Sequence, residues 1–135
     1  MLVAAAFTVV VGCGAGQSSA PRGPVVKLRN FAIDGPTTVR AGVVTFEVEG
    51  VGPTMHELNL AETSDSAHQL PQKADGTVDD QTDTATFHHV DEKEGVDIGD
   101  HTSMTVTLTP GHYAFYCNMD GHYSAGMSAD LTVTA

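Results

Sequence analysis

Short segments in which apolar and polar residues alternate with a period of two constrain the fold of this chain more than any other feature. The clearest is residues 43–51, VVTFEVEGV, where alternation places Val44, Phe46 and Val48 on one face and sends the glutamates to solvent. No window carries an apolar stripe with the 3.6-residue period of a helix, so long helices are not expected. The pattern predicts an all-β domain, an antiparallel β-sandwich or barrel.

Turn residues divide the remaining chain into further short strands. Gly52-Pro53 and Pro110-Gly111 are typical turn signals between alternating segments. Two polar and acidic stretches, residues 62–84 and 91–100, are expected to be loops, the first with at most one helical turn near residues 66–70. The expected strands are residues 25–33, 43–51, 56–60, 84–90, 103–108, 113–117 and 129–134.

The N-terminal residues resemble an export signal. Residues 2–11, LVAAAFTVVV, are apolar and uncharged. They are too few for a membrane-spanning helix of about 20 residues, but they suit the apolar segment of a secretory signal, about 7–15 residues. No Lys or Arg precedes this run, which departs from the usual signal. An alternative interpretation is a buried first strand with an incidental cysteine.

The end of the apolar run, Val10-Val11-Gly12-Cys13, resembles the lipobox of bacterial and archaeal lipoproteins. In that family the chain is cut before the cysteine, which then carries lipid. The resemblance implies a signal segment at residues 1–12 and a lipidated Cys13. Residues 13–24, rich in Gly, Ser and Pro, would then be a flexible tether to the outer face of the cell membrane, or to the periplasm.

Size and charge limit the possible functions of the rest of the chain. The 135 residues fit one domain, expected here at residues 25–135. With 17 acidic against 6 basic side chains, the net charge is −11. Nucleic acid is therefore excluded as a partner, because binding phosphates requires a basic surface. The acidic surface favours cationic partners, or serves solubility alone.

A cluster of metal-binding residue types lies near the C-terminus. Cys117, His122 and Met127 have the spacing C-x4-H-x4-M, in a loop between two expected strands. A thiolate, an imidazole and a thioether suit copper, and a His2Cys site with a long axial Met is the arrangement of blue-copper electron carriers. Such a site needs a second histidine. Of the seven in the chain, His56 is the best candidate, because it opens a strand just after the Gly52-Pro53 turn.

With these residues the chain resembles the cupredoxins, the blue-copper family of plastocyanin, azurin and rusticyanin. His56 matches the upstream histidine of that family, and Cys117, His122 and Met127 match the C-terminal loop in order. The resemblance covers about residues 25–135 and implies a Greek-key β-sandwich with one long acidic loop. It also implies one type 1 copper ion per chain, held by these four residues.

The same resemblance implies a monomeric protein that carries single electrons between redox proteins outside the cytoplasm. Its partners would be proteins such as a cytochrome or a terminal oxidase or reductase. Protein side chains fill all four coordination positions, so no site remains for a substrate and the chain is not expected to be an enzyme. Two departures from the family touch the rigidity of the site. Glu57 stands where many members have Asn, and Asp120-Gly121 where many have Pro-Gly.

Other functions remain open at the level of the sequence. A copper chaperone or copper reservoir is the main alternative, and a Met55 and Met119 pair would suit copper capture. A multicopper oxidase or copper nitrite reductase is disfavoured because the chain is short and has no His-x-His motif. A copper-free adhesion domain, in which Cys117 is a free thiol or pairs with Cys13, is the weakest option. The remaining histidines considered, His88, His89, His101 and His112, are expected to be solvated.

Overall fold

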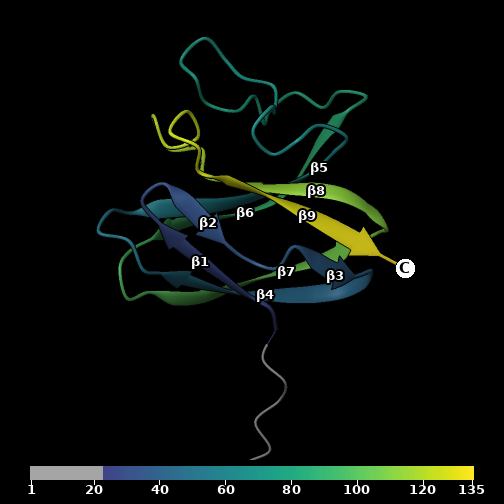
Figure 1. The fold of residues 1–135 in the computed structure, drawn as a ribbon, viewed down its shortest axis with the longest axis horizontal. Coiled ribbons are helices and arrows are strands. Elements are labelled where there is room, and N and C mark those ends of the chain that lie inside the picture. The colour runs from purple at the N-terminus through teal and green to yellow at the C-terminus, as the bar shows by residue number, and fades with distance from the viewer. Residues whose placement is uncertain (1–22) are drawn as a thin grey trace, which may run out of the picture.

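The computed structural model describes residues 23–135, which form two β-sheets packed face to face (Figure 1). The predicted signal segment, Cys13 and nearly all of the tether lie outside these residues. No helix within residues 23–135 could span a membrane. The strands are β1 (Val25–Arg29), β2 (Ala32–Asp34), β3 (Thr38–Arg40), β4 (Gly42–Gly50), β5 (His56–Thr63), β6 (Phe87–Val96), β7 (His101–Leu108), β8 (Gly111–Tyr116) and β9 (Ser128–Thr134).

The two sheets confirm the predicted all-β sandwich. One sheet has the strand order β2-β1-β4-β7 and the other has the order β3-β9-β8-β5-β6. Most pairs are antiparallel, but β1 runs parallel to β4 and β3 runs parallel to β9, so both sheets are mixed. Alternation shows which face a side chain occupies, but it does not show the direction of the neighbouring strand. The parallel pairs were therefore not visible in the sequence.

Three local predictions differ from the structure. The single strand expected at residues 25–33 is a hairpin of β1 and β2. Strand β3 was not predicted, because it is only three residues long. The acidic stretch 91–100 was expected to be a loop, but most of it belongs to β6, the edge strand of the five-stranded sheet. An edge strand tolerates exposed charges, which also discourage pairing with other chains. His101 and His112, which were expected in a loop and in a turn, lie in strands β7 and β8.

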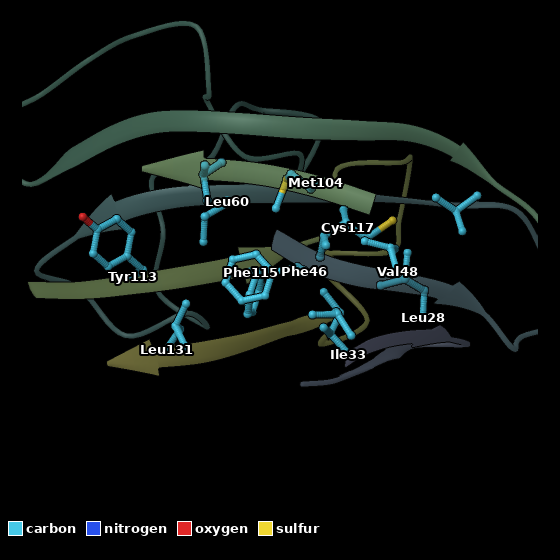
Figure 2. Packing of buried hydrophobic residues seen from close by; sticks show 14 of the residues in the cluster. Leu28, Ile33, Phe46, Val48, Leu60, Met104, Tyr113, Phe115, Cys117 and Leu131 are labelled. Carbon is cyan, nitrogen blue, oxygen red and sulfur yellow. The ribbon is translucent and has the colours of Figure 1, made fainter. Parts of the chain in front are cut away.

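The main core lies between the two sheets (Figure 2). Phe46 and Phe115 meet edge to face at its centre, with ring centroids 5.2 Å apart. Phe46 and Val48 are buried, as the alternation of β4 predicted. In Figure 2, Tyr113 and Leu131 lie toward one end of the core, and Cys117 lies beyond Phe46 in the other half, near Val48. The core therefore reaches the position where the predicted copper ligands begin.

A second apolar cluster covers the outer face of the five-stranded sheet. Residues 64–86, here named the outer segment, form no helix and only an isolated bridge between Gln72 and Val78. In Figure 1 this segment is the teal chain above β5 and β8. Because it covers the sheet, Tyr116 of β8 is buried on the outer face while Phe115 is buried in the main core. The outer cluster comprises Ala61, Ala67, Leu70, Val78, Phe87, Ala114, Tyr116 and Tyr123.

Candidate metal centre

His56 is placed by the turn that precedes β5. The strand begins at His56 itself, and the side chain is completely buried. Gly52, in the turn between β4 and β5, lies directly against the ring. A Cβ at position 52 would come within 2.9 Å of His56 Nε2 and within 2.8 Å of the Arg29 Cα. Any larger residue at 52 would therefore displace either the ring or the β1–β2 hairpin.

The loop between β8 and β9, residues 117–127, is closed by its own backbone hydrogen bonds. The Cys117 N–H donates to the Met127 carbonyl at 3.1 Å, and the Met127 N–H donates to the His122 carbonyl at 3.1 Å. The His122 N–H donates to the Met119 carbonyl at 2.9 Å. These bonds bring the beginning, middle and end of the loop together, so residues spaced five apart in the sequence become neighbours.

Three of the four predicted ligand residues meet in space. His56 Nδ1 and His122 Nδ1 are 3.2 Å apart, and Cys117 Sγ is 3.3 Å from His122 Nδ1. The donor atoms of all three residues lie within 4.8 Å of one another. His56 and Cys117 are fully buried, whereas His122 is half-buried. Within residues 23–135 no other group of three such side chains is close enough to hold a metal ion.

Met127 is the last residue of the loop that contains Cys117 and His122. Its side chain is completely buried and belongs to the same apolar cluster as Cys117. Through its backbone it bonds to both Cys117 and His122. The other methionines of interest differ in exposure, since Met55 is exposed and Met119 packs partly buried against the main core.

Burial disfavours the charged forms of His56 and Cys117. It lowers the pKa of His56, and the neighbouring His122 lowers that pKa further. Burial also raises the pKa of the Cys117 thiol, although the backbone N–H groups of Glu57 and Met119 oppose the rise. A metal ion would displace the thiol proton and accept the imidazole lone pairs. The two imidazole nitrogens and one sulfur form a soft-to-intermediate donor set that fits copper.

Glu57 links the two segments that supply the donors. Its backbone N–H points to Cys117 Sγ at 3.5 Å. Its half-buried carboxylate accepts hydrogen bonds from the Asn118 N–H at 2.9 Å and the Asn59 amide at 3.2 Å. Burial raises the pKa of Glu57, and the bonds from Asn59 and Asn118 partly offset this. A carboxylate thus makes the connection between β5 and the loop.

The sequence did not reveal two contacts of the site. One is the bond from the Asn118 N–H to Glu57, and the other is made by Phe31. Phe31, in the turn between β1 and β2, packs its edge against the His122 ring with centroids 5.2 Å apart. It is 44% exposed, so the half-buried face of His122 is bordered by an apolar side chain at the surface. No local pattern marks either residue, because the contact depends on how distant turns meet.

The other candidate residues lie apart from this group. His88 and His101 are exposed, and His89 and His112 are half-buried, each near a carboxylate. Cys117 forms no disulfide within the described part of the chain. Its possible partner Cys13 lies outside that part.

Comparisons with known proteins agree with this fold. The model of the copper-binding proteins of the plastocyanin/azurin family matches residues 37–134. Reduced auracyanin from the photosynthetic bacterium Roseiflexus castenholzii has a TM-score of 0.60 and 21% identity, covering 82% of this chain and 95% of that one. Auracyanin B has a TM-score of 0.57 and 25% identity, covering 82% of this chain and 87% of that one. Reduced rusticyanin has a TM-score of 0.55 and 18% identity, covering 82% of this chain and 77% of that one. No curated protein sequence matches the chain.

Together with the match to the family model, the β-sandwich and the group of two histidines and a cysteine define a copper protein of the cupredoxin class. The chain belongs to the plastocyanin/azurin family of copper-binding proteins. Its cofactor is copper, and proteins of this family generally carry electrons rather than act as enzymes.

Proposed function

We propose that this chain is a type 1 copper protein in which His56, Cys117, His122 and Met127 hold one copper ion. The observation that carries the proposal is the convergence of two imidazole nitrogens and one sulfur within 4.8 Å, from two buried residues and one half-buried residue. Met127 would be the fourth residue to hold the ion, through its thioether, because its buried side chain follows His122 in the same closed loop. Bound copper supplies one-electron chemistry by alternating between Cu(I) and Cu(II).

The protein's residues serve this chemistry by holding their donor atoms still. Cys117 is held by the Met127 carbonyl on its N–H and by the Glu57 N–H at its sulfur. Such bonds tune a metal site and orient its ligands. Side chains fill every coordination position, which leaves no position for a substrate and favours electron carriage over catalysis. His122 is the half-buried member of the donor group, so it is the donor residue nearest to solvent.

We further propose that the protein works outside the cytoplasm as a monomer anchored by a lipid on Cys13. The apolar run and the Val10–Cys13 motif support the anchor, and residues 13–24 supply a tether to the domain at residues 25–135. Its partners are redox proteins such as a cytochrome or a terminal oxidase or reductase. The net charge of −11 favours partners with a cationic docking surface.

Titration of the metal-free protein with Cu(II) tests the copper proposal. One equivalent is expected to give an intense blue absorption and reversible one-electron reduction. Cys117→Ser removes the thiolate, so it should abolish the blue band. His101→Ala, a control at an exposed histidine, should leave the band unchanged. A colourless wild type would refute the proposal, and rapid loss of copper to a weak chelator without reversible reduction would indicate a copper chaperone or reservoir instead.

Fractionation of cells that express the full chain tests the anchor. The wild type is expected in the membrane fraction with a lipid mass on Cys13, and Cys13→Ser is expected to release the protein. A wild-type protein recovered without lipid, or a Cys13→Ser variant that stays in the membrane fraction, would contradict the anchor.

A further inference from the structure

The loop of residues 117–127 contains side chains that the proposed copper site does not use. Asn118, Tyr123 and Ser124 lie between the assigned ligands in sequence. Each of them bonds to the outer segment, which is remote in sequence from the loop. These contacts join two irregular parts of the chain rather than two strands of a sheet.

Asn118 holds the loop from the residue directly after Cys117. Its side-chain oxygen accepts from the Val78 N–H at 2.6 Å, and its amide nitrogen donates to the Val78 carbonyl at 3.0 Å. The same nitrogen donates to the Asp80 carboxylate at 2.8 Å. Because its backbone N–H is bound to Glu57, Asn118 is fixed to β5 and to the outer segment at once. Movement of the Cys117 backbone would strain both connections.

Tyr123 holds the loop from the residue directly after His122. Its hydroxyl accepts from the Leu70 N–H at 2.9 Å and donates to the Ala67 carbonyl at 2.9 Å. The ring is buried and meets Tyr116 edge to face, with centroids 6.4 Å apart. Since Tyr116 directly precedes Cys117, this one ring connects the surroundings of His122 and of Cys117. Ser124 adds a bond to the Gly76 carbonyl at 3.1 Å.

We propose that the outer segment holds the loop of residues 117–127, the copper loop, in position, and we call it the brace. Asn118 and Tyr123 are then positioning residues of the site. The inference depends on the proposed function for the identity of the bound metal. Each positioning residue adjoins a donor residue, so a shift of the brace moves Cys117 or His122 directly. Supporting contacts of this kind keep ligands within the small tolerance that a metal site requires. A small ligand displacement between the two oxidation states keeps the barrier to electron transfer low.

If the outer segment served only to cover the sheet, the expected effects of substitutions would differ. If the outer segment only shields the apolar face of the sheet, loss of the Tyr123 hydroxyl costs stability and leaves the donor atoms in place. The hydroxyl of Tyr113, near the other end of β8, provides a control for the loss of a buried hydroxyl. Tyr113 is buried, and its hydroxyl bonds to the backbone and side chain of Thr109 at 3.2–3.3 Å.

The experiment compares Tyr123→Phe, Asn118→Ala and the matched control Tyr113→Phe in the full chain. In the metal-free proteins, amide exchange at His122 and Met127 should accelerate about fivefold or more in the first two variants, the factor for loss of about 1 kcal/mol from one hydrogen bond. In the copper-loaded proteins, electron self-exchange should slow about threefold or more and the Cu(II) hyperfine coupling should change. Tyr113→Phe should lose comparable stability and change none of these.

The outcomes separate the brace from the copper site itself. If wild type is blue and Tyr123→Phe keeps wild-type amide exchange, hyperfine coupling and self-exchange, the brace is refuted while the copper site stands. Equal changes in Tyr113→Phe would also refute it, because the effect would then be general loss of stability. A colourless wild type refutes the proposed function and the brace with it. Should Asn118→Ala not fold, Tyr123→Phe decides, because it removes a single oxygen atom.

Discussion

The main core and the outer cluster bury the two faces of the same strand, β8, but they are assembled from different parts of the chain. The main core takes its large side chains from strands of both sheets, such as Phe46 and Phe115. The outer cluster takes half of its members from outside the strands, and hydrogen bonds from Asn118 and Tyr123 fix its position. Packing between regular elements therefore builds the sandwich, and irregular chain held by polar contacts completes the surroundings of the metal centre.

A matched pair of leucine substitutions should separate the two regions. Leu131→Ala in the main core and Leu70→Ala in the outer cluster each remove a buried side chain, and each is expected to lower the free energy of unfolding by about 2–5 kcal/mol. Only Leu70→Ala should also alter the copper spectrum, because the cavity it leaves lets the backbone around residue 70 shift, and the N–H of that residue binds Tyr123. Urea unfolding and visible absorption measure the two effects. If both variants had the same copper spectrum, the outer cluster would have no greater influence on the metal centre than the main core.

Gly52→Ala tests the support of His56 by the turn between β4 and β5. The added Cβ would approach the His56 ring and the Arg29 backbone to under 3.0 Å. Such overpacking typically costs about 1–3 kcal/mol. We expect a lower unfolding free energy together with a shifted copper spectrum, since the ring has to move. Gly99→Ala is a suitable control for the added methyl group, because nothing lies within 4 Å of its Cβ position, although its positive φ of 84° adds strain. An unchanged spectrum in Gly52→Ala would show that the ring position does not depend on this glycine.

Glu57→Gln tests the half-buried carboxylate that connects β5 to the loop of residues 117–127. The amide oxygen can still accept from the Asn118 N–H, so the connection survives while the carboxylate charge is removed. Loss of a nearby negative charge favours Cu(I), and a change of about 1.4 kcal/mol corresponds to a rise of about 60 mV in reduction potential. Voltammetry of the two proteins checks the direction. A fall in potential would mean that the hydrogen bonds, rather than the charge, dominate at this position.

Asp75, in the outer segment, provides the smallest expected effect. Hydrogen bonds from the Thr77 hydroxyl and N–H lower the pKa of this exposed carboxyl below its usual 3.8. The contribution of ionised Asp75 to the free energy of unfolding is therefore complete above the pKa of the unfolded chain. It is lost as the pH falls through the lower pKa of the folded protein. Asp75→Asn should have a weaker pH dependence of stability below about pH 4 than the wild type. Identical acid unfolding curves would contradict a local contribution from this turn.

The difference between the two regions also explains how much the sequence could predict. Alternation in residues 43–51 correctly indicated the burial of Phe46 and Val48, since the period of a strand decides which face a side chain takes. The spacing of Cys117 and His122, together with the turn before His56, pointed to three residues that the structure brings together. Each of these features is local in the sequence, whereas the pairing of His56 with the distant loop was implied by the family resemblance.

The surroundings of the site could not be predicted in the same way. The outer segment contains few apolar residues, and the burial of Leu70 and Val78 depends on contacts with Tyr123 and Asn118 across the fold. The approach of Phe31 to His122 depends on the meeting of two distant turns. Such contacts leave no periodic pattern in the chain, so only the assembled structure reveals them.

X-ray absorption at the copper edge of the loaded protein tests the central claim most directly. Our account predicts one short bond to sulfur and two bonds to imidazole nitrogen, with the sulfur contribution lost in Cys117→Ser. A copper ion surrounded only by nitrogen and oxygen in the wild-type protein would contradict the assignment of Cys117, His56 and His122 as its ligands.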